Sequence, residues 1–491
     1  MQLTDKDLIS IQEVRNLLRE AKEAQKELAK MNQEQIDRIV KAIADAGYEN
    51  SEKLAKMAEE ETGFGKWQDK ILKNTFAAKQ VYESIKDLKT VGITKEDQDL
   101  QTMDIAVPMG VIAGIVPSTN PTSTAIYKTL ISLKGANTIV FSPHPSAKKC
   151  ILETVKILSE AAERVGCPKG AIGCISTPTL QATNELMKSD DTAMILATGG
   201  AAMVKAAYSS GNPALGVGAG NGPGFIDKSA NIKLAAKRII DSKTFDNGTI
   251  CASEQSIVVE KAIESAVISE LKAQGAYFLD EEESKKLEKF IMRPNGTMNP
   301  QIVGKTVEFI SNLADLTRVP KDAKVLIARE TRIGHNVPYS REKLGPVLAF
   351  YVADNLDEAC KLCRDILLNE GAGHSFMIHA EDKEVVKKFA LEMPVSRIPV
   401  NSPGALGGIG ATVNLAPALT LGCGSIGGSA TSDNVGPLNL INTKRVAYGI
   451  REIEDLRGDG STSNYCSNSS LSNNSEALID LLVKKIIKEL N

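Results

Sequence analysis

The sequence has little of what marks several specialised protein classes. Among 491 residues there are one tryptophan, four histidines and eight cysteines, and aromatic residues make up 4%. The cysteines are scattered, which argues against a disulfide framework and predicts reduced thiols in the cytoplasm. The single C-x-x-C pair, Cys360 and Cys363, falls on an apolar helical pattern and is expected to pack in a helix face. With so few histidines, no metal site is predicted.

The chain also lacks an excess of one charge and a hydrophobic run that could cross a membrane. Its formal net charge is −3, so neither nucleic acid nor an anionic membrane is an expected partner. Two stretches, 105–127 and 401–432, carry no charge, but prolines interrupt the first and glycine, serine and threonine fill the second. The first thirty residues read as a charged amphipathic helix and not as a signal peptide. The sequence therefore predicts a cytoplasmic protein.

The order of patterns along the chain predicts an α/β fold. Residues 5–88 show helical spacing of apolar residues, with Gly47 and Gly63 as expected helix stops. Strands then alternate with helices, as in a doubly wound parallel sheet. Strands are expected at 103–107, 111–116, 138–141, 171–175 and 194–197, and helices at 121–134, 146–165, 180–189 and 202–210.

A second alternation predicts a second α/β domain. We expect one domain over residues 1–228, to which 403–450 returns, and another over 229–402. In the second domain, strands are expected at 256–259, 324–328 and 347–351, and helices at 234–243, 263–274 and 356–367.

Three motifs carry side chains suited to covalent catalysis. Cys251 follows an Asn-Gly turn and precedes a β-branched run, where a thiol can be held rigidly as a nucleophile. Asn120, in Pro-Ser-Thr-Asn-Pro, lies between an expected buried strand and a helix, at the strand edge where ligands bind in parallel sheets. Glu342 begins Glu-Lys-Leu-Gly-Pro-Val. Taken singly, these residues are also consistent with a buried apolar cysteine, an Asn-Pro turn and a surface acid.

Together, these motifs resemble the aldehyde dehydrogenase superfamily, and in particular its coenzyme A-acylating branch. The resemblance covers about residues 5–450. It implies two doubly wound α/β domains, for cofactor binding and for catalysis, and a small oligomerisation element from strands at 103–107 and 443–450. It implies that Cys251 attacks an aldehyde, while the Asn120 amide and the backbone N–H of Cys251 stabilise the oxyanion. A homodimer or homotetramer is expected.

The resemblance also implies a set of contacts to NAD. The loop Thr198-Gly199-Gly200 would meet the pyrophosphate at a helix N-terminus, and Glu342 would bind the nicotinamide ribose. Each position has a plain structural alternative, such as a turn or a loop histidine. The expected cofactor residues are Ser142, His144, Thr198, Gly199, Gly200, Gly218 and Glu342.

One departure from the hydrolytic enzymes points to coenzyme A. Those enzymes carry a glutamate in Glu-Leu-Gly-Gly that activates water, whereas Val217 stands at the matching position here. A thiol needs no such base to release the acyl group, so the expected product is an acyl-CoA made from acetaldehyde or propionaldehyde. His374 could deprotonate the incoming thiol, or only make a structural hydrogen bond.

Arg397 leaves a second substrate class open. It could contact an acidic substrate or a cofactor phosphate, which would suit succinate semialdehyde or sulfoacetaldehyde, or it could pair with a carboxylate. A protein that keeps the fold without catalysis, as a scaffold or shell cargo, is an alternative of another kind.

The end of the chain has its own pattern. Residues 458–475 are rich in glycine, serine and asparagine and predict a disordered linker. Residues 476–490 predict an amphipathic helix whose apolar stripe needs a partner surface. This arrangement resembles the encapsulation peptides of bacterial microcompartment enzymes, which implies a shell protein as partner. The alternative is a helix packed back on its own subunit or a neighbour.

Overall fold

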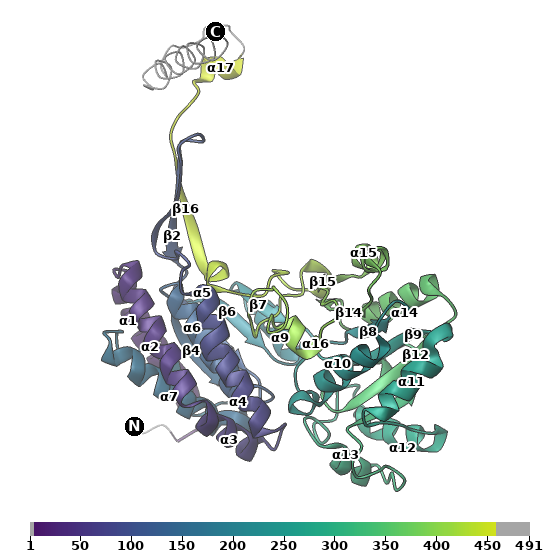
Figure 1. The fold of residues 1–491 in the computed structure, drawn as a ribbon. Helices are drawn as coiled ribbons and strands as arrows, with labels where there is room; N and C mark the ends of the chain where they lie inside the picture. Colours follow the sequence, from purple (N-terminus) through teal and green to yellow (C-terminus); the bar gives the residue numbers. More distant parts are fainter. Residues whose placement is uncertain (1–3, 458–491) are drawn as a thin grey trace, which may run out of the picture. The chain divides into compact units, whose positions relative to one another are not determined.

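The computed structural model describes residues 4–457 (Figure 1). They form two compact units, which we describe separately: a larger one up to residue 92 and over 106–442, and a smaller one from 93–105 and the chain after 442. The linker and helix predicted at 458–475 and 476–490 lie outside the described residues. Among the helices of residues 4–457, none is long and apolar enough to cross a membrane.

The first sheet of the larger unit has five parallel strands in the order β5, β4, β3, β6, β7. Every residue of β3 and β4 is buried, as expected for central strands with helices on both faces. The strands are β3 (Val111–Val116), β4 (Thr138–Pro143), β5 (Ile172–Cys174), β6 (Thr192–Thr198) and β7 (Ala214–Val217).

Helices cover both faces of this sheet. One apolar cluster joins α1 and α8 to alternate residues of β3 and β4, and another joins α2, α6 and α7 to the intervening residues. Helix α2 continues through Gly47 to Glu49, so the predicted stop is wrong: a Cβ on Gly47 would lie 3.1 Å from Ile126 Cγ2 in α6, and the glycine permits close helix packing. Gly63 does end a helix, in a left-handed conformation. The helices are α1 (Lys6–Leu28), α2 (Gln33–Glu49), α3 (Ser51–Thr62), α4 (Trp67–Thr75), α5 (Tyr82–Ile85), α6 (Pro121–Lys134), α7 (Lys148–Arg164), α8 (Leu180–Lys188) and α9 (Ala201–Tyr208).

The second sheet has six parallel strands in the order β10, β11, β12, β9, β8, β14. Helices α10 and α11 pack on one face, and α12, α14 and α15 on the other. Cys360 and Cys363 are buried on α14, as predicted. The strands are β8 (Pro223–Ile226), β9 (Ser256–Glu260), β10 (Ala276–Phe278), β11 (Val325–Arg329), β12 (Val347–Ala353) and β14 (Met377–His379), with the separate pair β13 (Gly373–Ser375) and β15 (Val395–Arg397). The helices are α10 (Ile232–Thr244), α11 (Glu264–Ala273), α12 (Glu281–Ile291), α13 (Val307–Leu313), α14 (Leu356–Asn369), α15 (Lys383–Glu392) and α16 (Gly404–Gly408).

Strand pairing places the crossing between the two sheets before the predicted boundary at 228. Strand β7 ends the first sheet at Val217, while Pro223–Ile226 already pairs with β9 and β14 of the second. Strands β7 and β8 are only four residues long and β8 contains Pro223 and Gly224, so neither was predicted as a strand and the boundary was set too late. After residue 403 the chain returns to the first sheet's helices, since the Tyr127 hydroxyl bonds the Val435 carbonyl and Asn137 Nδ2 donates to the Leu440 carbonyl at 2.8 Å.

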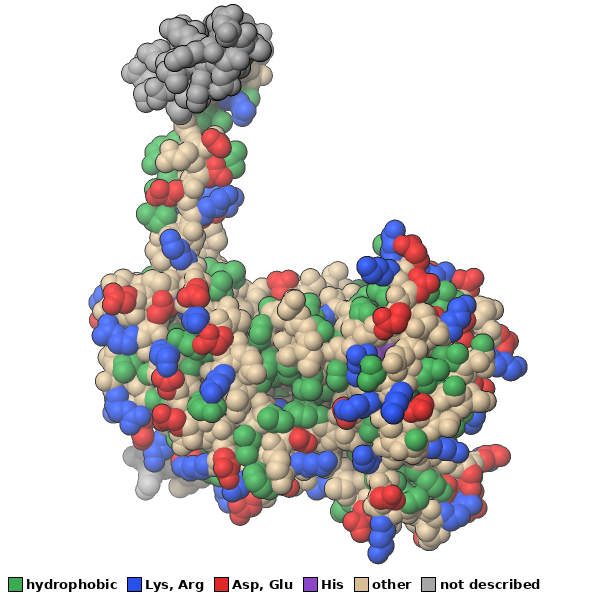
Figure 2. Space-filling view, in the orientation of Figure 1, with side chains coloured by type: hydrophobic (Ala, Val, Ile, Leu, Met, Phe, Trp, Pro, Cys, Tyr) green, Lys and Arg blue, Asp and Glu red, His purple; other side chains and the backbone are tan. Residues whose placement is uncertain are grey.

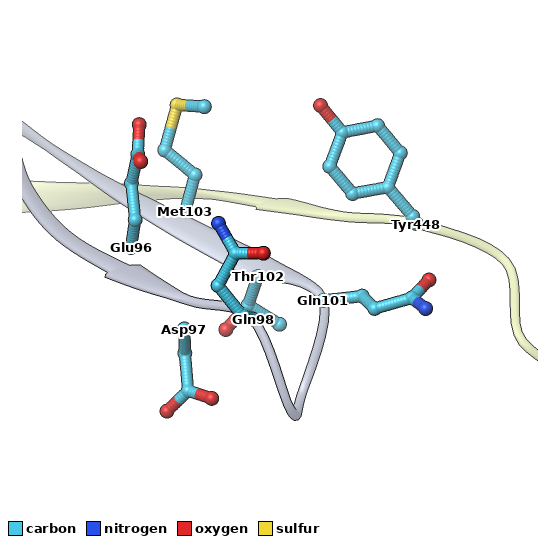
Figure 3. Close-up of a pocket in the computed structure, with 7 residues that line it drawn as sticks. All are labelled: Glu96, Asp97, Gln98, Gln101, Thr102, Met103 and Tyr448. Carbon is cyan, nitrogen blue, oxygen red and sulfur yellow. The ribbon is translucent and has the colours of Figure 1, made fainter. Parts of the chain in front are cut away.

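The smaller unit is built on a three-stranded sheet in the order β1, β2, β16, followed by α17 (Ile453–Arg457). Strands β2 (Thr102–Pro108) and β16 (Ile441–Ala447) match two of the predicted strands, and Arg445 forms a two-pronged ion pair with Asp104 at 2.6 and 2.8 Å. Strand β1 (Gly92–Asp97) was not predicted, because its residues are mostly polar and exposed. Figure 3 shows a shallow pocket here, with Glu96, Met103 and Tyr448 on one side of the strands; it contains none of the predicted site residues.

Candidate active site

Cys251 lies in a constrained turn between α10 and β9. The turn begins with Asp246, Asn247 and Gly248, which have φ angles of 48°, 52° and 74°. Left-handed conformations cost energy in non-glycine residues and persist only where the surroundings hold them. Here Asn247 Nδ2 donates to the Gly304 carbonyl at 2.9 Å, and the Asp246 carboxylate is buried among donors. Cys251 therefore follows a turn whose shape is fixed by tertiary contacts.

The glycine-rich segment after β7 packs directly against the Cys251 backbone. A Cβ on Gly220 would lie 1.9 Å from the Cys251 carbonyl oxygen, so only glycine fits this position. Val217, predicted to stand at the position of the hydrolytic glutamate, is buried at the end of β7. It belongs to the same apolar cluster against which Cys251 packs.

His374 is the side chain in contact with the Cys251 thiol. The Cys251 Sγ lies 3.3 Å from His374 Nε2, and His374 Nδ1 lies 2.9 Å from the Ser375 hydroxyl. Burial lowers the pKa of His374 to about 3 and raises the pKa of Cys251 to about 12. The pair is thus an uncharged thiol beside an uncharged imidazole, which is free to accept a proton. To accept the thiol proton at Nε2, the ring must carry its own proton on Nδ1, which the Ser375 hydroxyl can accept.

Arg397 supports His374 through the backbone. In β15, beside β13, its Nη1 donates to the His374 carbonyl at 2.9 Å. Its Nη2 donates to the Ser432 carbonyl at 3.1 Å and also to the Gly422 carbonyl. The alternative that Arg397 pairs with a carboxylate is wrong for residues 4–457, where its hydrogen bonds all go to carbonyl oxygens.

Asn120 follows β3 of the first sheet and reaches the loop that carries Cys251. It precedes α6, after β3, and its Nδ2 lies 3.2 Å from the Thr119 hydroxyl and 3.3 Å from the Thr249 carbonyl. Thr249 is two residues before Cys251. The Asn120 amide nitrogen therefore donates to the backbone two residues before Cys251, a position compatible with the predicted oxyanion role.

A buried ionic cluster that the sequence did not reveal lies behind Asn120. Lys70 and Lys73 of α4 both donate to Asp246 Oδ2, the former at 2.9 Å, and both ammonium groups are buried. Lys73 also donates to Asn120 Oδ1 at 2.5 Å. Helix α4 otherwise reads as a charged surface helix, so no local pattern marks these lysines. Only the burial of their ends against the turn at Asp246 distinguishes them.

Glu342 is also connected to the residues around Cys251. Its Oε1 accepts a hydrogen bond from the Gly220 N–H at 2.9 Å, and its own N–H donates to Glu370 Oε2 at 2.7 Å. Burial, and then the charge of Glu370, raises the pKa of Glu342 to about 8. The Glu342 carboxyl group therefore contacts Gly220, which in turn packs on the Cys251 backbone.

Six of the seven predicted cofactor residues lie at the carboxyl edge of the first sheet, at the ends of β4, β6 and β7, while Glu342 precedes β12 of the second sheet. Thr198 ends β6, its hydroxyl oxygen is buried without a hydrogen-bond partner, and Gly200 precedes α9. A Cβ on Gly200 would meet nothing within 4 Å, and one on Gly218 would approach only the Gly427 carbonyl, at 3.9 Å. An unsatisfied hydroxyl, open space and a helix N-terminus suit the pyrophosphate of a nicotinamide dinucleotide.

The predicted cofactor residues Ser142 and His144 differ in their availability to a ligand. Ser142 is buried in β4, and its hydroxyl lies 2.8 Å from the Thr183 hydroxyl of α8. His144 is exposed after β4, where its Nδ1 accepts from the Ser146 N–H at 3.2 Å. His144 can reach a ligand from this position, whereas Ser142 would first have to leave Thr183.

Neither sign of charge dominates the visible face of the larger unit in Figure 2. On the face shown in Figure 2, acidic and basic side chains are interspersed over the larger unit. In the part of the chain from residue 4 to 457, no group of three or more His, Cys, Asp or Glu side chains is placed to hold a metal ion.

This architecture is that of a known family. A model of the aldehyde dehydrogenase family matches residues 4–288. The chain is 45% identical over 443 residues to the bifunctional aldehyde-alcohol dehydrogenase AdhE of Escherichia coli strain K12, a match that covers 89% of this chain and 50% of that protein. The chain thus spans about half the length of this curated relative.

Two solved structures match over nearly their full length. One is a probable aldehyde dehydrogenase from Listeria monocytogenes EGD-e, with 67% identity, a TM-score of 0.92, and coverage of 92% of this chain and 100% of that chain. The other is an acetylating aldehyde dehydrogenase from Geobacillus thermoglucosidasius, with 56% identity, a TM-score of 0.90, and coverage of 92% and 99%. The chain belongs to the aldehyde dehydrogenase family.

Proposed function

We propose that this protein is a coenzyme A-acylating aldehyde dehydrogenase for short aldehydes such as acetaldehyde or propionaldehyde. The observation that carries the proposal is the environment of Cys251. The thiol contacts the neutral imidazole of His374, while the position of the hydrolytic glutamate is occupied by buried Val217. The site thus has a proton acceptor for thiols, and it lacks the carboxylate that activates water in the hydrolytic enzymes.

The first half of the reaction builds a thioester on the protein. His374 accepts the Cys251 proton as the sulfur attacks the aldehyde carbon, and the Asn120 amide and the Cys251 N–H stabilise the oxygen of the thiohemiacetal. A nicotinamide dinucleotide would supply the acceptor for the hydride that leaves this carbon. Thr198, Gly199, Gly200 and Gly218 would hold its pyrophosphate, and His144 and Glu342 its riboses. NAD is the proposed form.

The second half transfers the acyl group. His374 releases the first proton to solvent and then accepts the proton of the incoming coenzyme A thiol, whose sulfur attacks the thioester carbon. The carbon–sulfur bond to Cys251 breaks, and the sulfur leaves as a thiolate that is reprotonated. The products are an acyl-CoA, the reduced dinucleotide and free enzyme, and the reverse reaction uses the same intermediates.

Charged aldehydes are a poorer fit to this site. The Arg397 guanidinium, the group expected to bind their acid, donates to three backbone carbonyls. It is buried, and using it for a substrate would leave carbonyl oxygens without donors. Succinate semialdehyde and sulfoacetaldehyde are therefore not the proposed substrates.

The assembly and location of the protein belong to the same proposal. A homodimer or homotetramer would form through the strands predicted at 103–107 and 443–450, since sheet edges pair readily. The helix predicted at 476–490 would bind a shell protein and place the enzyme inside a bacterial microcompartment. Enclosure would suit a pathway with a volatile aldehyde.

The test is the formation of NADH from acetaldehyde and NAD with and without coenzyme A, with mass spectrometry of the product. We expect turnover that depends on coenzyme A and yields acetyl-CoA. Equal turnover without coenzyme A, with acetate as product, would overturn the proposal, and so would full activity of Cys251→Ala.

A further inference from the structure

The Lys73 ammonium group contacts the oxygen side of the Asn120 amide, the predicted oxyanion donor. It donates to Asn120 Oδ1 at 2.5 Å, to Thr249 Oγ1 at 3.0 Å, and to Asp246 Oδ2. An ammonium group has three protons, and here each one has an acceptor. One side chain therefore connects the loop of Asn120 to the turn that precedes Cys251.

This contact decides which way the Asn120 amide faces. An amide has an oxygen that only accepts and a nitrogen that only donates, while an ammonium group can only donate. Lys73 must therefore face Oδ1, which turns Nδ2 to the opposite side, toward the Thr249 carbonyl. With the amide reversed, two donors would oppose each other and Asn120 would offer an acceptor where the oxyanion develops.

The contact also strengthens the donor. A cation that is hydrogen-bonded to the carbonyl oxygen of an amide polarises the amide group. The N–H protons of that amide then become better hydrogen-bond donors. In the structure, Nδ2 makes only hydrogen bonds of 3.2 and 3.3 Å, to neutral oxygens. An oxyanion is a stronger acceptor than either of them and would replace them.

We propose that Lys73 is a positioning residue of the reaction, one that orients and polarises the Asn120 amide toward the aldehyde oxygen. The inference rests on the proposed function, because it gives Asn120 its role. Burial lowers the pKa of Lys73 to about 8, and the Asp246 carboxylate opposes that shift, so the ammonium form persists at neutral pH.

Lys70 provides a matched control on the same helix. It is as buried as Lys73 and also donates to Asp246 Oδ2, at 2.9 Å. Its second bond goes to the Thr119 carbonyl at 3.2 Å, and no Asn120 contact is among its hydrogen bonds. Removing either lysine takes one cation from Asp246, but only the loss of Lys73 frees the amide of Asn120.

The experiment is a double-mutant cycle on kcat/KM for acetaldehyde with Lys73→Met, Lys70→Met and Asn120→Ala. We expect Asn120→Ala to lose about 10²- to 10³-fold, as for other oxyanion donors. Lys73→Met should lose about 10- to 100-fold through kcat, with unchanged affinity for NAD. Because Lys73 acts through Asn120, Lys73→Met should cost nothing further in the Asn120→Ala background, whereas any loss from Lys70→Met should remain.

Alkylation of Cys251 by iodoacetamide separates this role from general damage. Alkylation develops no oxyanion, so its rate should be the same in Lys73→Met and wild type. Lys73→Arg, which keeps a cationic donor, should recover part of kcat. The inference is overturned if Lys73→Met loses no more than Lys70→Met, if its loss is additive with Asn120→Ala, or if Cys251 alkylation falls in parallel with turnover.

If Lys73→Met has a low melting temperature, which would indicate a folding defect, the same double-mutant cycle is measured with Lys73→Gln instead. The glutamine amide is a neutral hydrogen-bond donor. The smaller loss in Lys73→Gln should again vanish in the Asn120→Ala background, and persistence of that loss would overturn the inference. Wild-type enzyme is measured alongside, with and without coenzyme A. Turnover without coenzyme A would reject the proposed acylating function and leave the cycle interpretable.

Discussion

His374 Nε2 and Cys251 Sγ lie 3.3 Å apart, although the residues are 123 positions apart in the sequence. Neither partner is charged, because burial opposes both the thiolate and the imidazolium. A proton can move from sulfur to nitrogen once another charge favours the thiolate, as the positive ring of an oxidised nicotinamide would. The enzyme would then form its nucleophile only when the cofactor is present.

Replacing His374 with alanine should therefore slow both thiol steps. We expect kcat/KM for acetaldehyde to fall about 10²-fold or more, the usual loss of a general base. Stopped-flow measurement of the first NADH formed reports the Cys251 step, and acyl-CoA release reports the coenzyme A step.

Ser375→Ala is the control for this prediction. It removes the partner of His374 Nδ1 at 2.9 Å and leaves the base in place, so a smaller loss is expected. A normal first turnover in His374→Ala would show that another group accepts the Cys251 proton.

Arg397→Met should reduce activity toward neutral and charged aldehydes alike. The substitution leaves three carbonyl oxygens without their buried donor, including that of His374, so the geometry at Cys251 should loosen. We expect a lower melting temperature and an unchanged ratio of kcat/KM for acetaldehyde and succinate semialdehyde. A selective loss for succinate semialdehyde would instead assign Arg397 to substrate binding.

Val217→Glu should introduce some hydrolysis. It restores a carboxylate at the position of the hydrolytic base, beside the apolar cluster that contacts Cys251. We expect acetate to form without coenzyme A, together with lower stability from the buried acid. Val217→Gln has the same size without the base and should form none. If Val217→Glu also forms no acetate, the residue at 217 does not decide between water and coenzyme A.

Glu254 should make stability depend on pH. The side chain is fully buried, Oε1 accepts from the Gly404 N–H at 2.9 Å and Oε2 has no partner. Burial raises the pKa of Glu254 to about 7. The folded state therefore binds more protons than the unfolded state between the ordinary glutamate pKa and about 7, so stability falls as pH rises through that window.

Glu254→Gln should remove this dependence. We expect a gain of about 3 kcal/mol at pH 8 and little change at pH 4.5, measured by denaturant unfolding at both values. An equal effect at both pH values would mean that Glu254 does not titrate in this range.

The two α/β alternations could be predicted from the sequence, because the spacing of apolar residues within each buried strand and amphipathic helix reflects the environment of that element. The helix at Pro121–Lys134 and the strand at Val111–Val116 match their predicted bounds. The strand Gly92–Asp97 was missed because its polar residues carry no burial pattern. The domain boundary predicted at 228 lies too far along the chain, because the local sequence pattern of a strand does not show to which sheet the strand belongs.

The sequence by itself determined the fold class and singled out Cys251 as the candidate nucleophile, because periodicity and the motifs around Cys251, Asn120 and Glu342 lie in adjacent residues. Tertiary structure alone decided which side chains surround Cys251. It placed His374 on the thiol, gave Arg397 to backbone carbonyls and set Lys73 behind Asn120. Such contacts join residues far apart in the chain, and a buried lysine on α4 has the same local pattern as a solvated one.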